Sequence, residues 1–131
     1  FIHYPLAMHK HARPAAVAAE CANQQGRFAE FSKELFRVQD SIGRKAWSEF
    51  AVAVGADSET LELCMESESA ARLVADNVEL GERFGVQYTP TVMINGWAFT
   101  VPPTQPELLE VVKRLLSGET LPEAGMVSVG K

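Results

Sequence analysis

The chain has 131 residues, with 12 basic and 17 acidic side chains and a formal net charge of −5. Hydrophobic residues make up 47% of it, which is enough for a core and excludes global disorder. The acidic balance argues against nucleic-acid binding, because affinity for phosphate depends on clustered Lys and Arg. No run of about 18 apolar residues occurs, so we expect no membrane-spanning helix.

The sequence opens on an apolar stretch and not on Met. It lacks the basic segment, apolar run and cleavage site of a signal peptide, so we expect a processed, trimmed or cut chain. Phe1 to Tyr4 are β-branched, aromatic or His residues and predict a short strand that Pro5 ends.

Five helices are expected next, because apolar residues recur at helical spacing between glycines that end helices. The first is Ala-rich, and its small residues favour close packing against a neighbour. The second has one apolar face that runs from Phe28 to Ile42. The third helix is expected at Ala46–Val54. A fourth should begin after a cap at Asp57 or Ser58. A fifth should run from a cap at Ser67 or Ser69 to Phe84.

A hairpin follows the helices. Thr91–Ile94 and Trp97–Val101 read as strands, and Asn95-Gly96 between them predicts a type I′ turn, which needs positive φ at both positions. Thr104 and Glu107 then form a capping box for a last helix that ends near Gly118. Helices between strands indicate an α/β protein, and the tail at residues 119–131 is expected to be loosely held.

The segment before the hairpin could carry chemistry. Pro90 cannot donate to a strand ladder, so it must precede the paired residues. A cis bond before Pro90 would leave the N–H and C=O of Thr89 free to pair with an extended peptide. The alternative is an ordinary trans proline, which the rarity of cis bonds favours, at about 5–6% of X-Pro bonds.

Residues 85–91 (GVQYTPT), followed by Ile94-Asn95-Gly96, resemble the cis-Pro loop and terminal hairpin of DsbA-like thiol–disulfide oxidoreductases. The resemblance runs from Phe1 to about Leu116. Its other matching residues are Tyr4-Pro5-Leu6, His9, His11, Ala18 to Ala22, Gln25 to Phe28, Leu35-Phe36, Leu61 and Cys64.

This resemblance implies an α/β thioredoxin-like fold with an inserted helical subdomain at about residues 12–84. The cis-Pro loop, hairpin and final helix would occupy residues 86–117 of a single domain at residues 1–118. Thr89 and Pro90 would bind the substrate backbone.

One departure from the family is large. The family's redox centre is a Cys-x-x-Cys, whereas this chain has two cysteines, Cys21 and Cys64. In the resembled fold the dithiol lies on a strand–helix unit before the first strand, and that unit also supplies a central strand. We therefore expect a fragment whose N-terminal unit was cleaved, lies outside this sequence or belongs to another chain, and no catalytic residue in the chain itself.

Cys21 and Cys64 have three possible states: two buried free thiols, a structural disulfide, or a redox-active pair. Family members that resemble this chain often carry a second bridge between these helices, so the resemblance favours the disulfide. A disulfide in turn favours a periplasmic or otherwise extracytoplasmic location, because cytosolic thiols are kept reduced.

Other polar and aromatic residues point to no further site. His3, His9 and His11 could suggest a metal, but zinc sites need four ligands, usually with nearby Cys, so no metal or cofactor is expected. The acidic residues Glu20, Glu30, Glu34 and Glu49 read as solvated helix faces, and Trp47 and Trp97 as core or rim residues.

The leading hypothesis is the C-terminal portion of a DsbA-like oxidoreductase. It would act on unfolded or thiol-containing protein substrates, with a redox partner protein. One alternative is a thioredoxin-fold module that binds a peptide or partner without redox chemistry. Another is a glutathione-dependent transferase or isomerase of the same fold.

Overall fold

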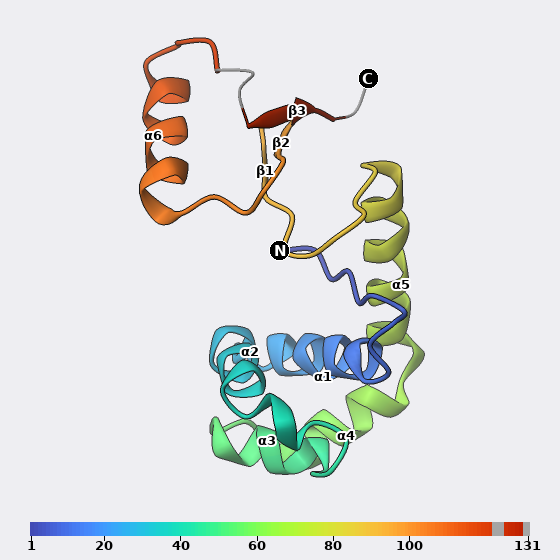
Figure 1. Cartoon of the computed structure of the whole chain (residues 1–131). Coiled ribbons are helices and arrows are strands. Elements are labelled where there is room, and N and C mark those ends of the chain that lie inside the picture. Colours follow the sequence, from blue (N-terminus) through green and yellow to red (C-terminus); the bar gives the residue numbers. More distant parts are fainter. Residues whose placement is uncertain (122–124, 130–131) are drawn as a thin grey trace. The chain divides into compact units, whose positions relative to one another are not determined.

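A computed structural model of the chain describes residues 1–121 and 125–129. The chain divides into two compact units, Phe1–Gly81 and Glu82–Lys131 (Figure 1). The division lies close to residue 85, where the sequence predicts a change from helices to a loop and hairpin. The single domain over residues 1–118 stays a prediction.

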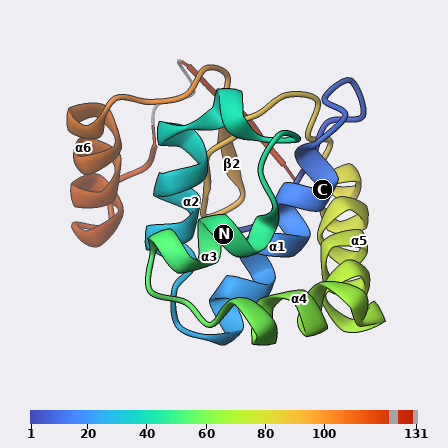
Figure 2. The same ribbon diagram turned by 90° about the horizontal axis from the view of Figure 1, so that it is seen from below.

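The first unit is helical. It contains α1 (Ala12–Gln24), α2 (Phe28–Arg37), a 3-10 turn (Gln39–Ser41), α3 (Trp47–Ala53), α4 (Ser58–Glu66) and most of α5 (Glu68–Arg83). Helix α1 packs against α2 and α4, and α3 packs against α2 and α4 (Figure 2). No helix in the described part of the chain is long and apolar enough to cross a membrane.

Small side chains of α1 lie at the centre of this unit. Ala18 and Ala22 have no exposed surface, and the larger residues Phe31, Leu61 and Val74 are equally buried around them. An alanine brings little bulk between two helices, so the helix axes can approach closely. The predicted close packing of the Ala-rich helix is confirmed.

Asp57 begins α4 as the sequence predicts. Its Oδ1 accepts a hydrogen bond of 2.7 Å from the backbone N–H of Thr60. This bond occupies one of the N–H groups that a helix start leaves without a partner. Of the two predicted caps, Asp57 and Ser58, the structure uses Asp57.

Two predictions in this unit are wrong. Phe1–Tyr4 form no strand, because a strand needs a neighbouring strand and no described residue forms a strand pair with them. Helix α2 ends at Arg37 and does not reach Ile42. Val38 and Ile42 still pack against the core from the following turn, so their apolar spacing is satisfied without a helix.

The second unit combines a small antiparallel sheet with α6 (Gln105–Leu116). Its strands are β1 (Met93–Ile94), β2 (Trp97–Phe99) and β3 (Met126–Ser128), in the order β1-β2-β3. Met93 pairs with Ala98, and Ile94 pairs with Trp97.

The predicted turn between β1 and β2 is confirmed. Asn95 and Gly96 have φ angles of 48° and 79°, both in the left-handed region that a type I′ turn requires. The predicted capping box of α6 is also present: Thr104 N–H and Oγ1 both donate to Glu107 Oε2 at 2.7 Å.

Strand β3 is not predicted by the sequence. It lies in the tail that was expected to be loosely held, yet its Met126 is only 5% exposed and packs with Phe99 and Val111. Backbone and side chain of Thr100 both donate to the Gly125 carbonyl, at 3.0 and 3.1 Å. The expectation of a loose tail therefore fails at Met126–Ser128, while residues 122–124, 130 and 131 lie outside the described part.

Candidate functional site

The candidate binding loop, residues 86–91, lies between α5 and β1. Both Thr89 and Pro90 are exposed, and the peptide bond between them is cis. Gly85 ends the preceding helix with a φ of 70°. The structure therefore places the two predicted substrate-binding residues next to each other on the surface of the second unit.

One hydrogen-bonding side chain joins the candidate binding loop to the hairpin, and another closes the loop on itself. The Tyr88 hydroxyl donates to the Thr100 carbonyl at 2.7 Å and lies 3.3 Å from the Phe99 carbonyl. Thr91 Oγ1 donates to the Tyr88 carbonyl at 2.6 Å. Tyr88 thus joins the loop to the end of β2, a positioning role that sequence reasoning missed.

Thr89 differs from its neighbours in its backbone. Within the described residues, neither its N–H nor its C=O takes part in a backbone hydrogen bond. An exposed donor and acceptor on one residue, beside a strand, can pair with an extended peptide. The hydrogen bonds of Tyr88 and Thr91 fix the loop conformation that presents the N–H and C=O of Thr89.

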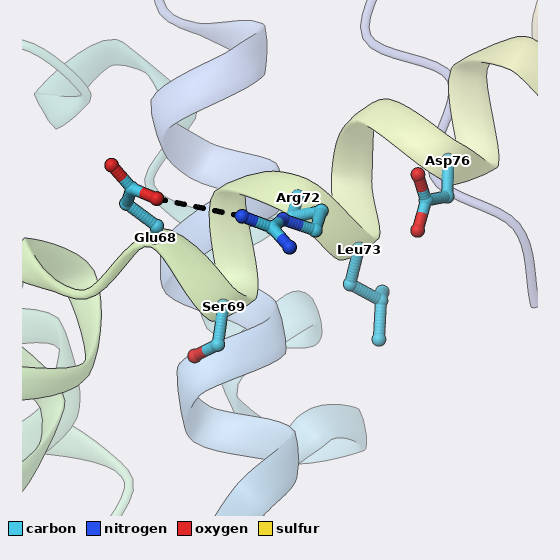
Figure 3. A pocket seen from close by; sticks show the side chains of 5 residues that line it. All are labelled: Glu68, Ser69, Arg72, Leu73 and Asp76. Carbon is cyan, nitrogen blue, oxygen red and sulfur yellow. Dashed lines mark hydrogen bonds and ion pairs between the residues drawn. The ribbon is translucent and has the colours of Figure 1, made fainter.

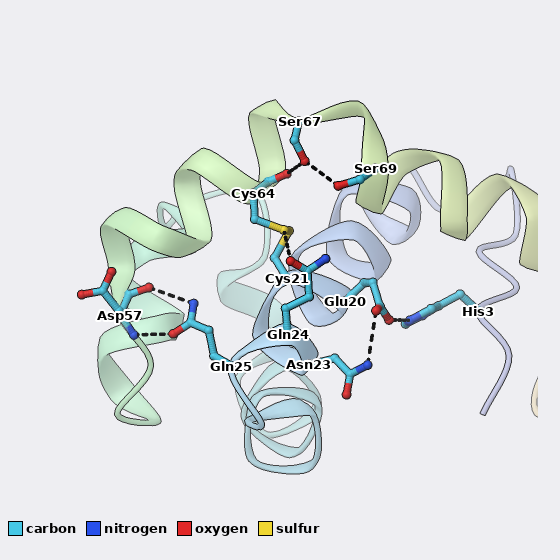
Figure 4. Close-up of a disulfide and its surroundings, with 10 residues drawn as sticks. All are labelled: His3, Glu20, Cys21, Asn23, Gln24, Gln25, Asp57, Cys64, Ser67 and Ser69. Atoms are coloured by element: carbon cyan, nitrogen blue, oxygen red, sulfur yellow. Dashed lines mark hydrogen bonds and ion pairs between the residues drawn. A yellow bond between two sulfur atoms is a disulfide. The ribbon is translucent and has the colours of Figure 1, made fainter.

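The two cysteines form a disulfide that joins α1 to α4 (Figure 4). Their Cα atoms are 5.7 Å apart. Cys21 is 1% exposed, whereas Cys64 is partly exposed and its Sγ lies 3.6 Å from Gln24 Oε1. Of the three states that the sequence leaves open, the structure shows the disulfide.

The surroundings of this disulfide favour a structural role. Each cysteine lies in the C-terminal half of its helix, where the helix dipole disfavours a negative thiolate. Neither helix has a basic residue in its last turn. The two helices therefore offer little stabilisation to a thiolate at these positions, which favours a structural bond over a redox-active pair.

A second link between the same helices lies at the other end of α4 from Cys64 (Figure 4). The Gln25 side chain donates to the Asp57 carbonyl at 3.1 Å and accepts from the Asp57 N–H at 2.7 Å. Together with the disulfide, this pair of bonds ties the end of α1 to the start and the end of α4.

His3 and Glu20 form a buried polar pair, which corrects the prediction that Glu20 faces solvent. His3 Nε2 lies 3.6 Å from Glu20 Oε2, and Asn23 Nδ2 donates to Glu20 Oε1 at 3.2 Å (Figure 4). Burial lowers the pKa of His3 below its ordinary value of 6.5, against the opposing attraction of Glu20. Sequence spacing could not reveal this pair, because its members lie on separate segments.

The remaining candidates have structural roles. Glu49 accepts from the Ala46 N–H at the start of α3, Glu34 pairs with Arg37 at 2.7 Å, and Glu30 lies 3.9 Å from Arg27. Trp47 and Trp97 are partly buried against the cores of their units, as predicted. The described residues contain no group of three or more His, Cys, Asp or Glu side chains that could hold a metal.

A shallow depression of about 420 Å³ lies on α5 (Figure 3). Its lining residues are Glu68, Ser69, Arg72, Leu73 and Asp76, all from this one helix. Arg72 lies 3.5 Å from Glu68, and both side chains of this ion pair remain largely exposed to solvent. The depression contains none of the predicted site residues.

Comparison with known proteins identifies the chain's relatives. Na⁺/H⁺ antiporters NhaA 1 of Mycolicibacterium gilvum and Mycolicibacterium vanbaalenii are each 36% identical to it over 97 residues, and NhaA 3 of Salinispora tropica is 30% identical over 95. These alignments cover 72% of the chain but 15–16% of each relative, so the chain spans about one sixth of their length. No solved structure shows significant similarity.

The family comparison covers more of the chain. The family model described as Thioredoxin matches residues 1–114, which include α1 to α5, the candidate binding loop, the hairpin and most of α6. The helices and small antiparallel sheet agree with the expected α/β thioredoxin-like fold. The chain belongs to the thioredoxin family.

Proposed function

We propose that the chain is the C-terminal portion of a DsbA-like thiol–disulfide oxidoreductase that acts on protein disulfides. Membership of the thioredoxin family over residues 1–114 carries this proposal. The redox dithiol would come from a Cys-x-x-Cys outside the 131 residues, since Cys21 and Cys64 are bonded to each other and poorly suited to exchange.

In this proposal the candidate binding loop holds the substrate. Thr89 pairs through its free N–H and C=O with an extended substrate chain, Pro90 shapes the loop and Tyr88 fixes it to β2. The partners are unfolded or thiol-containing proteins and a redox partner protein. The Cys21–Cys64 disulfide supports a periplasmic or otherwise extracytoplasmic location.

The chemistry is a balanced exchange of bonds. A substrate thiolate attacks one sulfur of the oxidised dithiol and displaces the other sulfur as a thiolate. A second substrate thiolate then attacks the mixed disulfide, so a disulfide forms in the substrate and the dithiol is left reduced. The substrate loses two electrons and the dithiol gains them.

Peptide binding to the 131-residue chain tests whether the candidate binding loop binds substrate, independently of the redox dithiol. A cysteine-free extended peptide should shift the NMR amide signals of Thr89 and Thr91 and leave those of Arg72 and Leu73 on α5 unchanged. Tyr88→Phe removes the bonds to β2 and should weaken binding several-fold, while the matched variant Tyr4→Phe should not. Shifts confined to other surfaces would contradict the assignment.

The natural reading frame tests the redox assignment. We expect a Cys-x-x-Cys about 20–30 residues before Phe1, on the first strand–helix unit. The full protein should oxidise, reduce or isomerise disulfides of an unfolded substrate, and Ser at both of those cysteines should abolish this. A natural protein without the motif and without exchange activity would end the redox proposal but not the peptide-binding one.

Similarity to NhaA-named proteins favours a second candidate, a thioredoxin-fold binding module that forms part of a membrane transport protein. It predicts peptide or partner binding at residues 86–91 with no thiol exchange by the full protein. A third hypothesis is a glutathione-dependent transferase or isomerase of the same fold. Equilibrium dialysis that detects no glutathione binding would remove it.

A further inference from the structure

Strand β3 lies along the edge of β2 that faces away from β1 (Figure 1). Residues 126–128 pair with residues 97–99 in antiparallel register. Met126 is buried, whereas Val127 and Ser128 are exposed. One side chain of β3 therefore anchors the strand in the core, and backbone hydrogen bonds to the edge of β2 hold the rest of it.

Thr100, which follows β2, is hydrogen-bonded to two different segments. Its backbone N–H and its Oγ1 donate to the Gly125 carbonyl at 3.0 and 3.1 Å, and Gly125 directly precedes β3. The carbonyl of Thr100 accepts a hydrogen bond of 2.7 Å from the Tyr88 hydroxyl. Thr100 thus connects the start of β3 to the candidate binding loop, and all of these residues belong to the second unit.

The candidate binding loop depends on Tyr88 for its attachment to β2. Within the described residues, the side-chain hydrogen bonds that join residues 86–91 to the end of β2 come from the Tyr88 hydroxyl. The bond of Thr91 returns to the Tyr88 carbonyl, inside the loop. A loop that is ordered before a peptide arrives loses less conformational entropy on binding, so its attachment raises affinity.

We propose that β3 is a positioning element of the candidate binding loop. Docked on β2, it holds Thr100, whose carbonyl holds the Tyr88 hydroxyl, and this keeps Thr89 in the conformation that meets a peptide. Release of β3 loosens the loop and lowers peptide affinity. The effect on affinity rests on the proposed function of the loop, whereas the effect on loop order does not. The family match ends at residue 114, before β3, so this support is additional to the matched region.

Val127→Pro is designed to release β3 without changing a buried side chain. Val127 lies opposite Ala98. Two residues to either side, at Thr100 and Gly96, the edge of β2 is hydrogen-bonded to the residues that flank β3. Bonded pairs alternate along an antiparallel ladder, so the N–H of Val127 faces β2, and proline has no N–H to offer there. Val127→Thr keeps this N–H and is the matched control.

Hydrogen exchange at two adjacent amides reports whether β3 alone is released. The Thr100 amide donates to Gly125, whereas the Phe99 amide donates to the Val92 carbonyl at 3.0 Å, on the side of β1. In Val127→Pro the Thr100 amide should lose its protection and the Phe99 amide should keep it. This pattern shows that β3 has left the sheet while the hairpin remains folded.

NMR order parameters of the Thr89 and Thr91 amides measure the loop without any ligand. In the wild type they should lie near the value of about 0.85 that is typical of rigid backbone. Val127→Pro should lower them toward the flexible range below about 0.6, and Val127→Thr should leave them unchanged. The affinity for a cysteine-free extended peptide should fall several-fold in Val127→Pro as well.

Two further comparisons test the route through Thr100 and Tyr88. In a Tyr88→Phe background the hydroxyl is absent, so Val127→Pro should cause little further loss of loop order or affinity. Thr100→Val removes the side-chain donor to Gly125 and should loosen the loop, whereas Thr100→Ser retains a hydroxyl and should preserve it. If Val127→Pro does not fold, the Thr100 pair decides.

The outcomes separate this role from the proposed function. Loop order that stays at the wild-type value after β3 is released would overturn the positioning role, even if the peptide binds. An equal loss with and without the Tyr88 hydroxyl would also overturn it. A fall in loop order, in a protein whose wild type binds no peptide, would support the positioning role and contradict the proposed function of the loop.

Discussion

At the scale of single residues, Tyr4 and Gly81 show how closely the N-terminal segment lies against α5. A Cβ added at Gly81 would collide with the Tyr4 ring. Glycine inside a helix costs up to about 1 kcal/mol relative to alanine, so propensity alone favours Ala at this position. The residue is small because the ring occupies the space where a side chain would be.

Gly81→Ala should therefore destabilise the protein, by about 1–3 kcal/mol, because the extra methyl displaces Tyr4. In a Tyr4→Ala background the same change should become neutral or stabilising, since the ring is gone and helix propensity decides. Urea unfolding of the four proteins in this cycle measures the effect. An equal loss in both backgrounds would show that the ring is not the obstacle.

At the scale of elements, α4 and α6 each begin at a carboxylate held by hydrogen bonds. Thr60 lowers the pKa of Asp57 below 3.8, and Thr104 lowers that of Glu107 below 4.5, because both donate to the charged form. Such groups stabilise the folded chain above their unfolded pKa, and this stability is lost as the pH falls through the lowered folded pKa.

We expect the free energy of unfolding to fall as the pH drops below about 4.5, with the two helix starts contributing. Asp57→Asn and Glu107→Gln should each lower stability at pH 7 and flatten this acid dependence. Urea midpoints at pH 7 and pH 3 provide the measurement. Glu62→Gln, on the exposed side of α4, is the control and should keep the wild-type slope.

At the scale of the whole molecule, the two units differ in covalent cross-linking. The first unit contains a disulfide, and no disulfide joins described residues of the second unit. The Cys21–Cys64 disulfide closes a separation of 43 positions. A loop of this size contributes about 4 kcal/mol in the chain-entropy treatment.

Removing the bridge with Cys21→Ala and Cys64→Ala should therefore cost about 4 kcal/mol in urea unfolding. The amide signals of Ala98 and Phe99 in the sheet should stay unchanged in the folded variant. A loss below about 1 kcal/mol would mean that α1 and α4 hold together without the bridge. Alkylation of the unreduced protein provides a separate check, and two modified thiols would contradict the bond itself.

Local chemistry explains what the sequence predicts well. Asn95-Gly96, Asp57 and the Thr104–Glu107 box each specify a turn or a helix start through their own backbone and neighbours. The candidate binding loop is predicted in another way, from the resemblance of residues 85–91 to a cis-Pro loop, and its role in binding stays a prediction.

Features that depend on distant partners could not be predicted. Strand β3 exists because β2 offers it an edge, and Glu20 is buried because His3 comes to it from another segment. The bond from Tyr88 to Thr100 likewise becomes visible only when the loop and the strand are placed together. Each of these contacts is a property of the folded chain and not of a sequence window.

The alanines of α1 also affect how stability changes with temperature. Alanine has no side-chain rotamers to lose, so burying Ala16, Ala18, Ala19 and Ala22 adds no side-chain entropy cost. Each of them also exposes little apolar area on unfolding, and that area sets most of the heat-capacity change. A core with so many alanines should have a small heat-capacity change for its size. Its stability curve should then be broad and shallow, with little difference between cool and warm conditions.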